Sequence, residues 1–450
     1  MPAASDAPAG ADPDLLLRAD WVLTMAPGDA VRRDATVALA GDRIVAVLPA
    51  AEARTRWPLA PETRLTGQAL LPGLVNAHGH AAMTLLRGFA DDMHLEPWLQ
   101  ERIWPLEARW VSAPWVADGT ELAIAEMLKG GTTTFSDMYF FPEVAAAVAQ
   151  RSGIRAQLCA PVLRFGNAWA EGPEDAIRRG LALRDEYRDA GRIRIAFGPH
   201  STYVNELEHL RRIAVLSEEL DMAVQIHLHE TAEEVAGAVA ERGERPLETV
   251  ERAGLLGPRL QAVHMTRLET RDCEHLARHG VSVVHCPQSN LKLASGFCPT
   301  AELRAAGVNL ALGTDGAASN NALSLFREMH VAAILAKLVA GDAAALPALE
   351  VLRAATLGGA EALGLGEETG SLEPGKAADL VAVALDGLGL EPVYHPESQL
   401  VYTCTDACVR HVWVAGTRLV EDGRLLRTDE AELLRRVRRW RDRVLAETDA

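Results

Sequence analysis

Two histidines separated by a single glycine, His78 and His80, are the side chains whose spacing points most directly to metal chemistry. The apolar run LLPGLVNA comes directly before them, so the pair stands where a strand is expected to end. Residues i and i+2 of a strand point to the same side, which lets both imidazoles face one ion, and Gly79 leaves the backbone room for close approach. Taken alone, the pair is equally compatible with a structural role.

Two residues much further along the chain complete a ligand set. His227 lies near the end of the apolar run AVQIHLHE, and Asp315 ends another in LGTDG. Three imidazole nitrogens and one carboxylate suit Zn²⁺ and leave a position open for water, although these ligand types also accept Fe²⁺ or Mn²⁺. Four such side chains at the ends of three separate strands are not expected to coincide by chance, so we predict a metal site.

The elements that must hold these ligands follow a regular alternation. Helical patterns, such as those over 118–130 and 208–220, separate short β-branched or apolar runs. Eight runs occupy residues 70–80, 132–138, 155–163, 193–200, 223–230, 260–266, 281–287 and 308–316. Eight strands alternating with helices over about 250 residues predict an α/β fold, a (β/α)8 barrel of the TIM type, whose active site lies at the carboxyl ends of the strands. An open doubly wound sheet would need a glycine-rich phosphate loop after the first strand, and NAHGH is not one.

Both ends of the chain have a different pattern. Residues 14–66 and 378–425 alternate like strands and contain the hairpin signals AGDR and AGTR. We therefore predict a composite β-sandwich domain from residues 1–67 and 368–450, around a barrel of residues 68–367. The basic amphipathic stretch 429–447 is predicted to be a solvated surface helix.

Composition narrows the classes of partner. The 450 residues carry a net charge of −17, from 45 basic and 62 acidic side chains, which disfavours nucleic acid and anionic membranes. The N-terminal residues MPAASDAPAGADPD resemble neither a signal peptide nor a transit peptide, and no apolar run reaches the roughly 18–20 residues of a membrane helix. Six scattered cysteines predict reduced thiols. These features predict a cytoplasmic protein.

Several motifs, taken in their order, resemble those of the amidohydrolase superfamily. They are LLPGLVNAHGHAAMTLLRG, HLHET, VHMT, HCPQSNLKLASG, LGTDGAASNN and, near the C-terminus, GSLEPGKAADLVAV. Within that superfamily the chain is similar to the 5-methylthioadenosine/S-adenosylhomocysteine deaminases, a group close to the s-triazine hydrolases, chlorohydrolases and guanine deaminases. The resemblance covers nearly the whole chain and implies a hydrolytic deaminase, a purine nucleoside as small-molecule substrate and a homo-oligomer.

The resemblance also implies roles for individual residues. It assigns metal binding to the four side chains already singled out, namely His78, His80, His227 and Asp315. Glu230 matches the catalytic carboxylate of the family, and His264 matches a histidine that holds the metal-bound water. The segment FGPH, which ends at His200, has no lysine at the place where dimetal relatives carry one that bridges their two metals. This absence favours one metal per subunit.

Three further matches concern the substrate. Glu107, in IWPLEARW, matches a glutamate that binds the sugar hydroxyls, and His200 matches a substrate-binding histidine. Arg164 lies near the place of an arginine found in some members. The loop 288–296 has no role that its spacing defines, and the remaining histidines, among them His275 and His279, are expected to have none.

The chemistry of such a site follows from the residue types. Asp315 can accept a proton from the attacking water, and Glu230 can protonate the ring nitrogen beside the attacked carbon. His264 can orient the nucleophile and offset charge on the intermediate. Alternatives stay open: Glu230 as a helix-start carboxylate, His264 as a buried structural imidazole, another N-heterocycle (guanine, an s-triazine or a cyclic amide) as substrate, or a non-catalytic metal-binding relative.

Overall fold

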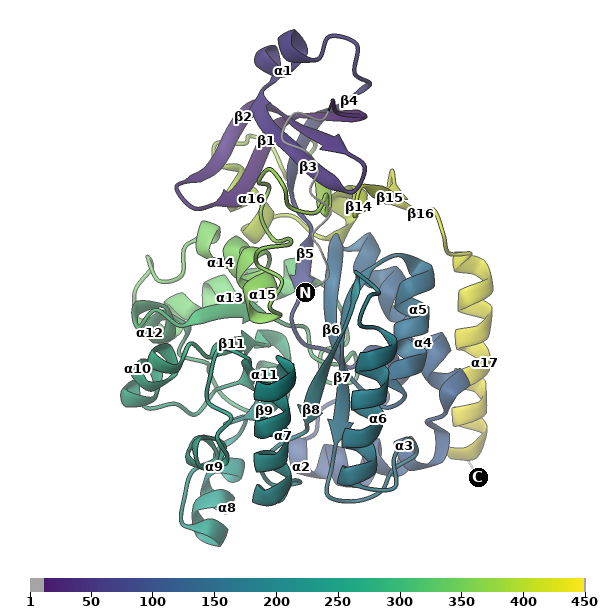
Figure 1. Cartoon of the computed structure of the whole chain (residues 1–450), viewed down its shortest axis with the longest axis vertical. Helices are drawn as coiled ribbons and strands as arrows, with labels where there is room; N and C mark the ends of the chain where they lie inside the picture. Colours follow the sequence, from purple (N-terminus) through teal and green to yellow (C-terminus); the bar gives the residue numbers. More distant parts are fainter. Residues whose placement is uncertain (1–11, 449–450) are drawn as a thin grey trace.

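Two sheets of eight strands each organise the chain, one above the other in Figure 1. The computed structural model describes residues 12–448, and most of the N-terminal stretch analysed for targeting signals, residues 1–11, lies outside them. Within the described residues, no helix combines the length and apolar character that crossing a bilayer requires. The lower sheet and its helices form the barrel, and the upper sheet combines strands from both ends of the chain.

The barrel strands are all parallel and stand in chain order around the sheet. They are β5 (Leu74–Asn76), β6 (Thr132–Met138), β7 (Arg155–Val162), β8 (Ile193–Pro199), β9 (Val224–Leu228), β10 (Leu260–His264), β11 (Ser282–His285) and β12 (Asn309–Leu312). The first and last strands meet along a seam, where Ala77 N donates to Leu312 O at 2.9 Å and Asp315 N donates to His78 O at 3.1 Å. The predicted (β/α)8 barrel is therefore confirmed.

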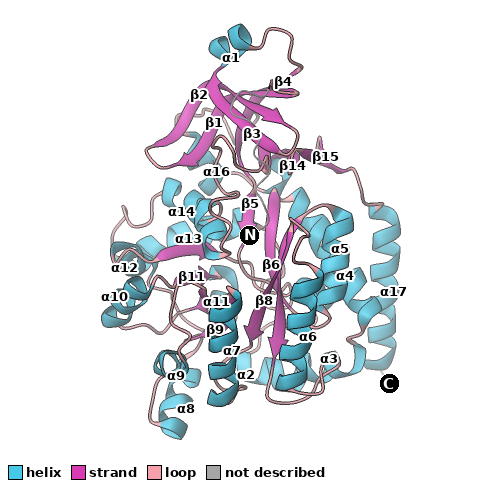
Figure 2. Cartoon of the chain, in the orientation of Figure 1, coloured by secondary structure: helices cyan, strands magenta, loops and turns pink. Residues whose placement is uncertain are grey.

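The helices that cover the barrel follow their strands, as Figure 2 shows. They include α4 (Ala113–Lys129), α5 (Pro142–Ser152), α6 (Pro173–Glu186), α7 (Leu207–Leu220), α8 (Ala232–Arg242), α9 (Pro246–Ala253), α10 (Thr270–His279), α11 (Pro287–Lys292), α12 (Thr300–Ala305), α13 (Leu325–Ala340), α14 (Ala348–Ala354) and α15 (Leu357–Ala362). The short segments α2 (Leu95–Pro97) and α3 (Trp104–Trp110), with α8, lie at the end of the barrel farthest from the upper sheet.

The first predicted strand, 70–80, is divided between the two sheets. Residues up to Pro72 belong to β4 (Glu62–Pro72) of the upper sheet, whereas the barrel strand β5 begins at Leu74. Gly73 between them packs so closely on Thr133 that any Cβ there would overlap this side chain. We propose Gly73 and the segment 366–371 as the two points where the chain crosses between domains, the first of them later than predicted.

The upper sheet has the order β16-β15-β14-β13-β4-β1-β2-β3. Its other strands are β1 (Leu15–Ala26), β2 (Asp29–Ala40), β3 (Arg43–Pro49), β13 (Leu380–Ala384), β14 (Val409–Val414), β15 (Thr417–Glu421) and β16 (Arg424–Leu425). The two ends of the sheet fold over each other, because the turn at Gly416 touches the carbonyl group of Gly41. Leu17, Val37 and Trp413 are buried in the core between them. The composite domain from both termini is thus present.

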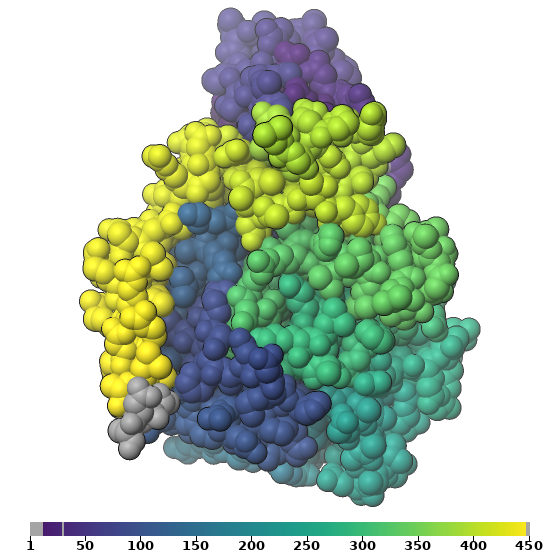
Figure 3. Space-filling view, turned by 180° about the vertical axis from the view of Figure 1, so that it is seen from behind, coloured from purple at the N-terminus to yellow at the C-terminus, as the bar shows by residue number. Residues whose placement is uncertain are grey.

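The C-terminal helix α17 (Glu430–Thr448) is a largely exposed surface helix, as predicted, but one of its faces packs on the barrel. It lies along the flank of the barrel, in bright yellow in Figure 3, and packs against α4. Trp440 is buried among Trp110 and Trp115, with ring centroids 6.4 and 5.1 Å away, and its Nε1 donates to Asp118 Oδ2 at 2.7 Å. The basic pattern of the stretch concealed this apolar anchor, so the predicted solvated surface helix is present but also has a buried face that the sequence analysis missed.

Candidate metal centre and substrate cavity

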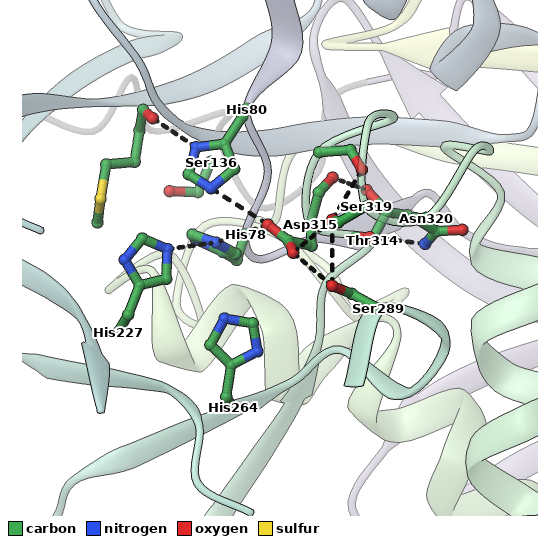
Figure 4. Close-up of polar contacts among 12 residues, drawn as sticks. His78, His80, Ser136, His227, His264, Ser289, Thr314, Asp315, Ser319 and Asn320 are labelled. Atoms are coloured by element: carbon green, nitrogen blue, oxygen red, sulfur yellow. Dashed lines mark hydrogen bonds and ion pairs between the residues drawn. The ribbon is translucent and has the colours of Figure 1, made fainter. Parts of the chain in front are cut away.

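The four predicted metal ligands come together at the carboxyl ends of three barrel strands. His78 and His80 follow β5, His227 lies on β9 and Asp315 follows β12, and one ligand atom from each lies within 4.8 Å of the others. Asp315 Oδ1 is 3.4 Å from His78 Nε2 and 3.1 Å from His80 Nε2. Figure 4 shows these rings and that of His264 turned toward a common space beside the Asp315 carboxylate.

Hydrogen bonds behind the rings decide which nitrogen of each histidine faces this space. His227 Nδ1 lies 2.7 Å from the backbone oxygen of His200, and His80 Nδ1 lies 2.6 Å from that of Met138. A carbonyl oxygen only accepts, so both Nδ1 atoms carry a proton, and Nε2 is the atom of each ring that is left to bind a cation.

The third histidine is oriented by a side-chain amide. Gln225 Oε1 lies 2.7 Å from His78 Nδ1, while Gln225 Nε2 donates to Ala77 O at 2.9 Å and to Gln261 Oε1 at 2.7 Å. These two acceptors fix which end of the amide faces His78, so the His78 Nδ1 atom must donate. His78 Nε2 therefore also offers a lone pair to the shared space.

This arrangement fits a cation. The Nε2 atoms of His78 and His227 lie 3.2 Å apart with no proton between them, and two lone pairs at that distance repel each other. An ion between them, with the Asp315 carboxylate as a further ligand, removes the repulsion. Three imidazoles and one carboxylate are a donor set typical of Zn²⁺.

Asp315 is held from behind by two hydroxyl groups. Ser289 Oγ and Ser319 Oγ donate to Asp315 Oδ2 at 2.6 and 2.7 Å, which leaves Oδ1 facing the histidines. Burial favours the neutral acid, but the adjacent imidazoles of His78 and His80 keep the pKa of Asp315 well below its usual range. Asp315 is therefore an ionised ligand.

Close backbone approach is needed at a different glycine from the predicted one. A Cβ at Gly79 would meet its nearest atom, the Asp315 carbonyl oxygen, at 3.4 Å, which is ordinary contact. A Cβ at Gly313 would lie 2.9 Å from the backbone of His78. Gly313, the first glycine of LGTDG, thus allows the segment after β12 to bring Asp315 beside the histidines.

Glu230 and His264 stand next to the four ligands. Glu230 Oε1 is 3.8 Å from His264 Nε2, and both side chains are almost fully buried. Burial raises the pKa of Glu230 to about 8, and the charge of Asp315 adds to this shift. Glu230 therefore carries a proton at neutral pH, as a general acid must.

The backbone around these two residues is tightly held. Glu234, from the first turn of α8, accepts a hydrogen bond from Glu230 N at 2.5 Å, and Thr266 Oγ1 donates to Glu230 O at 2.7 Å. His264 Nδ1 lies 2.8 Å from Asn290 Oδ1, which fixes the ring plane. The interpretation of Glu230 as a surface carboxylate at a helix start does not agree with this burial.

The three predicted substrate residues lie at different depths. Glu107, in α3, lines the inner cavity and accepts a hydrogen bond from Tyr139 OH at 2.6 Å; burial raises its pKa to about 7. His200 lines the same cavity, and burial lowers its pKa to about 3. Arg164 lies outside, at the rim of a second, roomier cavity, with Nη1 4.0 Å from Glu206.

The inner cavity is lined by both polar and apolar side chains. The polar ones include three residues of the metal group (His80, His227 and Asp315), Glu230 and Glu107, and the apolar ones, called the apolar wall below, include Met83, Leu95, Trp98 and Leu99. The outer cavity shares Leu95, Leu99 and Tyr203 with it and continues outward past α8. A flat polar group can therefore reach the metal group while a longer substituent extends outward.

Several residues of the site were missed by the sequence analysis. The loop 288–296, for which no role was defined, supplies Ser289 behind Asp315 and Asn290 behind His264. Tyr139 and Gln225 lie on or just after apolar strands, where an aromatic or amide side chain carries no distinct signal. Only the short polar run QSN, directly after the strand VSVVHC, could have indicated side chains directed at the site.

Comparison with known proteins agrees with this geometry. Residues 69–419 match the amidohydrolase family. The 5-methylthioadenosine/S-adenosylhomocysteine deaminase of Teredinibacter turnerae is 49% identical over 431 residues, which are 96% of this chain and 98% of the relative. A zinc-bound crystal structure described as an adenosine deaminase from Xanthomonas campestris has a TM-score of 0.94 and 50% identity, and covers 97% of this chain and 100% of its own.

More distant structures share the same fold. A zinc complex of atrazine chlorohydrolase from Arthrobacter aurescens has a TM-score of 0.89 at 25% identity, with 95% of this chain and 99% of its own covered. The match over most of the chain, together with the converging histidines and aspartate, places the protein in the amidohydrolase family.

Proposed function

We propose that the protein is a hydrolytic deaminase that converts 5′-methylthioadenosine, S-adenosylhomocysteine or adenosine to the corresponding inosine analogue and ammonia. The observation that carries this proposal is the position of Glu230, a protonated carboxyl group in the cavity that holds the metal group and Glu107. The names of two similar proteins, a 5-methylthioadenosine/S-adenosylhomocysteine deaminase and an adenosine deaminase, support it.

We also propose Zn²⁺ as the metal, held by His78, His80, His227 and Asp315. The donor types and the zinc in two of the similar crystal structures support this choice. A zinc ion bound there lowers the pKa of a water ligand toward neutrality and so supplies the nucleophile. Fe²⁺ and Mn²⁺ remain compatible with the donors.

Three side chains carry out the proton transfers and orient the nucleophile. Glu230 donates its proton to the ring nitrogen next to the carbon that bears the amino group, which makes that carbon more electrophilic. Asp315 accepts the proton that the attacking water gives up and delivers it to the departing amine, which leaves as ammonia. The proton that remains on the attacking oxygen passes to the Glu230 carboxylate as the C=O bond of the product forms. His264, held by Asn290, orients the attacking oxygen.

Glu107 binds the ribose hydroxyls of the nucleoside in this proposal. Glu107 Oε1 already accepts a hydrogen bond from Tyr139, and the ionised carboxylate retains lone pairs for a pair of ribose hydroxyls. The apolar wall near Met83 and Trp98 suits a 5′-thioether, and the outer cavity, with Arg164 at its rim, leaves room for a longer 5′-substituent. A free base or triazine would leave the remaining acceptor sites of Glu107 without a partner, at a cost of about 1–3 kcal/mol.

Ammonia release tests the assignment. We expect kcat/KM to be highest for an adenine nucleoside among 5′-methylthioadenosine, S-adenosylhomocysteine, adenosine, adenine, guanine and an s-triazine. The 2′-deoxy and 3′-deoxy forms of the best substrate are matched controls, because each removes one hydroxyl from Glu107 and should raise KM. A higher kcat/KM for guanine or a triazine, or indifference to the diol, would show that the assignment is wrong.

We also propose a cytoplasmic location for the enzyme. All six cysteines are free thiols, five of them buried, which supports the cytoplasmic location predicted from the sequence. The homo-oligomer implied by the resemblance stays a prediction.

A further inference from the structure

A second cluster of potential metal ligands lies on the outside of the barrel, where the sequence analysis assigned no role. Glu251 stands on α9, and His275 and His279 stand one turn apart on α10. One ligand atom from each lies within 4.8 Å of the other two, and His275 Nε2 is 3.3 Å from Glu251 Oε1. The rings of the two histidines are 4.5 Å apart and nearly perpendicular, at 69°.

The tautomer of His279 is fixed in a form that can bind a cation. His279 Nδ1 lies 2.9 Å from the backbone oxygen of His275, to which it can only donate. Its Nε2 therefore presents a lone pair. Histidines at i and i+4 on one helix face the same side, and a carboxylate from the adjacent helix supplies a third ligand.

The two helices are locked together close to the cluster. Arg245, which precedes α9, donates to both carboxylate oxygens of Asp272 in the first turn of α10, at 3.0 and 2.7 Å. The side chains of this pair are 12% and 8% exposed, which makes the contact rigid. Glu251 and His275 follow further along the same two helices, so they are presented at a fixed spacing and a cation would require little rearrangement.

One neighbour competes with a cation. Arg278 Nη2 lies 3.2 Å from His275 Nδ1, which must then accept, so the His275 proton sits on Nε2 and faces Glu251. Binding of a cation at Nε2 requires His275 to exchange this proton, through solvent, for one at Nδ1, and Arg278 to move away. The protein therefore gains and loses no net proton, but it loses the contact with Arg278.

We propose that Glu251, His275 and His279 form a second, solvent-accessible site for a divalent ion of the Zn²⁺ class, distinct from the metal centre at the carboxyl end of the barrel. Two imidazoles and a carboxylate leave coordination positions for water. The ion joins α9, which follows the strand of His227, to α10, which follows the strand of His264. The site binds more weakly than the buried centre, because only three side chains hold it and Arg278 opposes it.

The test uses the full-length enzyme with its catalytic metal loaded. Titration with Zn²⁺ against a chromophoric zinc indicator should reveal one further equivalent per chain, accompanied by a rise in Tm. His275→Gln and His279→Gln should each abolish the second equivalent and the rise in Tm, while catalytic metal content and deaminase activity stay unchanged. Arg278→Gln should tighten the second site by about fivefold, because a surface contact no longer competes.

A matched control comes from another histidine–glutamate pair. His395 Nδ1 lies 3.4 Å from Glu397 Oε1, and within the described residues no second imidazole joins them in a possible metal group. His395→Gln should leave the zinc stoichiometry as it is. The proposal is wrong if the wild-type holoenzyme binds no second equivalent, or if that equivalent persists in the His275→Gln/His279→Gln double variant. A failure of either kind leaves the proposed deaminase activity untouched.

Discussion

Gln225 Oε1 accepts a hydrogen bond from His78 Nδ1 at 2.7 Å, and this contact is the inner end of a chain of amides inside the barrel. Gln261 Oε1 accepts from Gln225 Nε2 at 2.7 Å and from Gln157 Nε2 at 2.8 Å. The three glutamines come from β7, β9 and β10 and are buried, in an interior that branched aliphatic residues usually fill. The polar interior thus serves to orient a metal ligand.

Loss of this amide should weaken metal binding. Gln225→Leu leaves His78 Nδ1 without its acceptor, so we expect metal affinity to fall about 10–100-fold. Metal dissociation measured with a competing chelator checks this. Gln157→Leu removes an amide of the same size that does not touch His78, and its effect on metal affinity should be clearly smaller. Equal losses of metal affinity in the two variants would mean that the three glutamines act only through the overall stability of the protein.

The second prediction concerns the proton donor. Glu230→Gln keeps the shape of the side chain but has no transferable proton, so turnover should fall by at least about 100-fold with metal content unchanged. Glu233→Gln changes an exposed neighbouring carboxylate and should leave kcat close to the wild-type value. If the Glu230 variant retains activity, Glu230 has no role as the acid.

The third prediction is a bell-shaped pH profile of kcat/KM. As pH falls through about 7, Glu107 becomes protonated and no longer accepts both ribose hydroxyls. As pH rises through about 8, Glu230 loses the proton that it donates. Activity should therefore decline on both sides. In Glu107→Gln the acidic limb should disappear while the alkaline limb stays; the opposite result would reverse the two assignments.

The fourth prediction links the C-terminal helix to substrate binding. Trp440 of α17 packs on Trp110, which belongs to the same short helix as Glu107. Trp440→Ala should cost about 3–5 kcal/mol of the free energy of unfolding and also raise KM, with little change in kcat. Trp57→Ala, in the upper domain, is a control for the loss of a partly buried indole elsewhere. An unchanged KM for the Trp440 variant would separate α17 from the substrate site.

The sequence predicted those parts of the molecule that have periodic or chemically distinct signals. The strand over 132–138 agrees with β6 residue for residue, and the three histidines and one aspartate at predicted strand ends are the residues that the fold brings together as the metal group. The break at Gly73 was not visible, because the residues on both sides of it are equally apolar. The glutamine chain was missed for a related reason, since an amide inside an apolar run looks like an ordinary interruption.

The backbone conformation at two residues of the site could not be predicted from the sequence either. His264 and Asp315 have positive φ angles of 76° and 60°, which residues other than glycine adopt rarely and at some energetic cost. Surrounding contacts impose these angles, and no local pattern of residue types encodes them. Sequence could therefore name both residues but not the directions in which they point.

The location of the metal group on the barrel seam sets an order of events during biosynthesis. His78 and His80 leave the ribosome with the first barrel strand, whereas Asp315 emerges only after the last one. The same peptide segments that bring Asp315 to His78 also join β12 to β5. A nascent chain therefore has no complete cage for the ion, and we expect metal loading to follow release of the finished barrel from the ribosome.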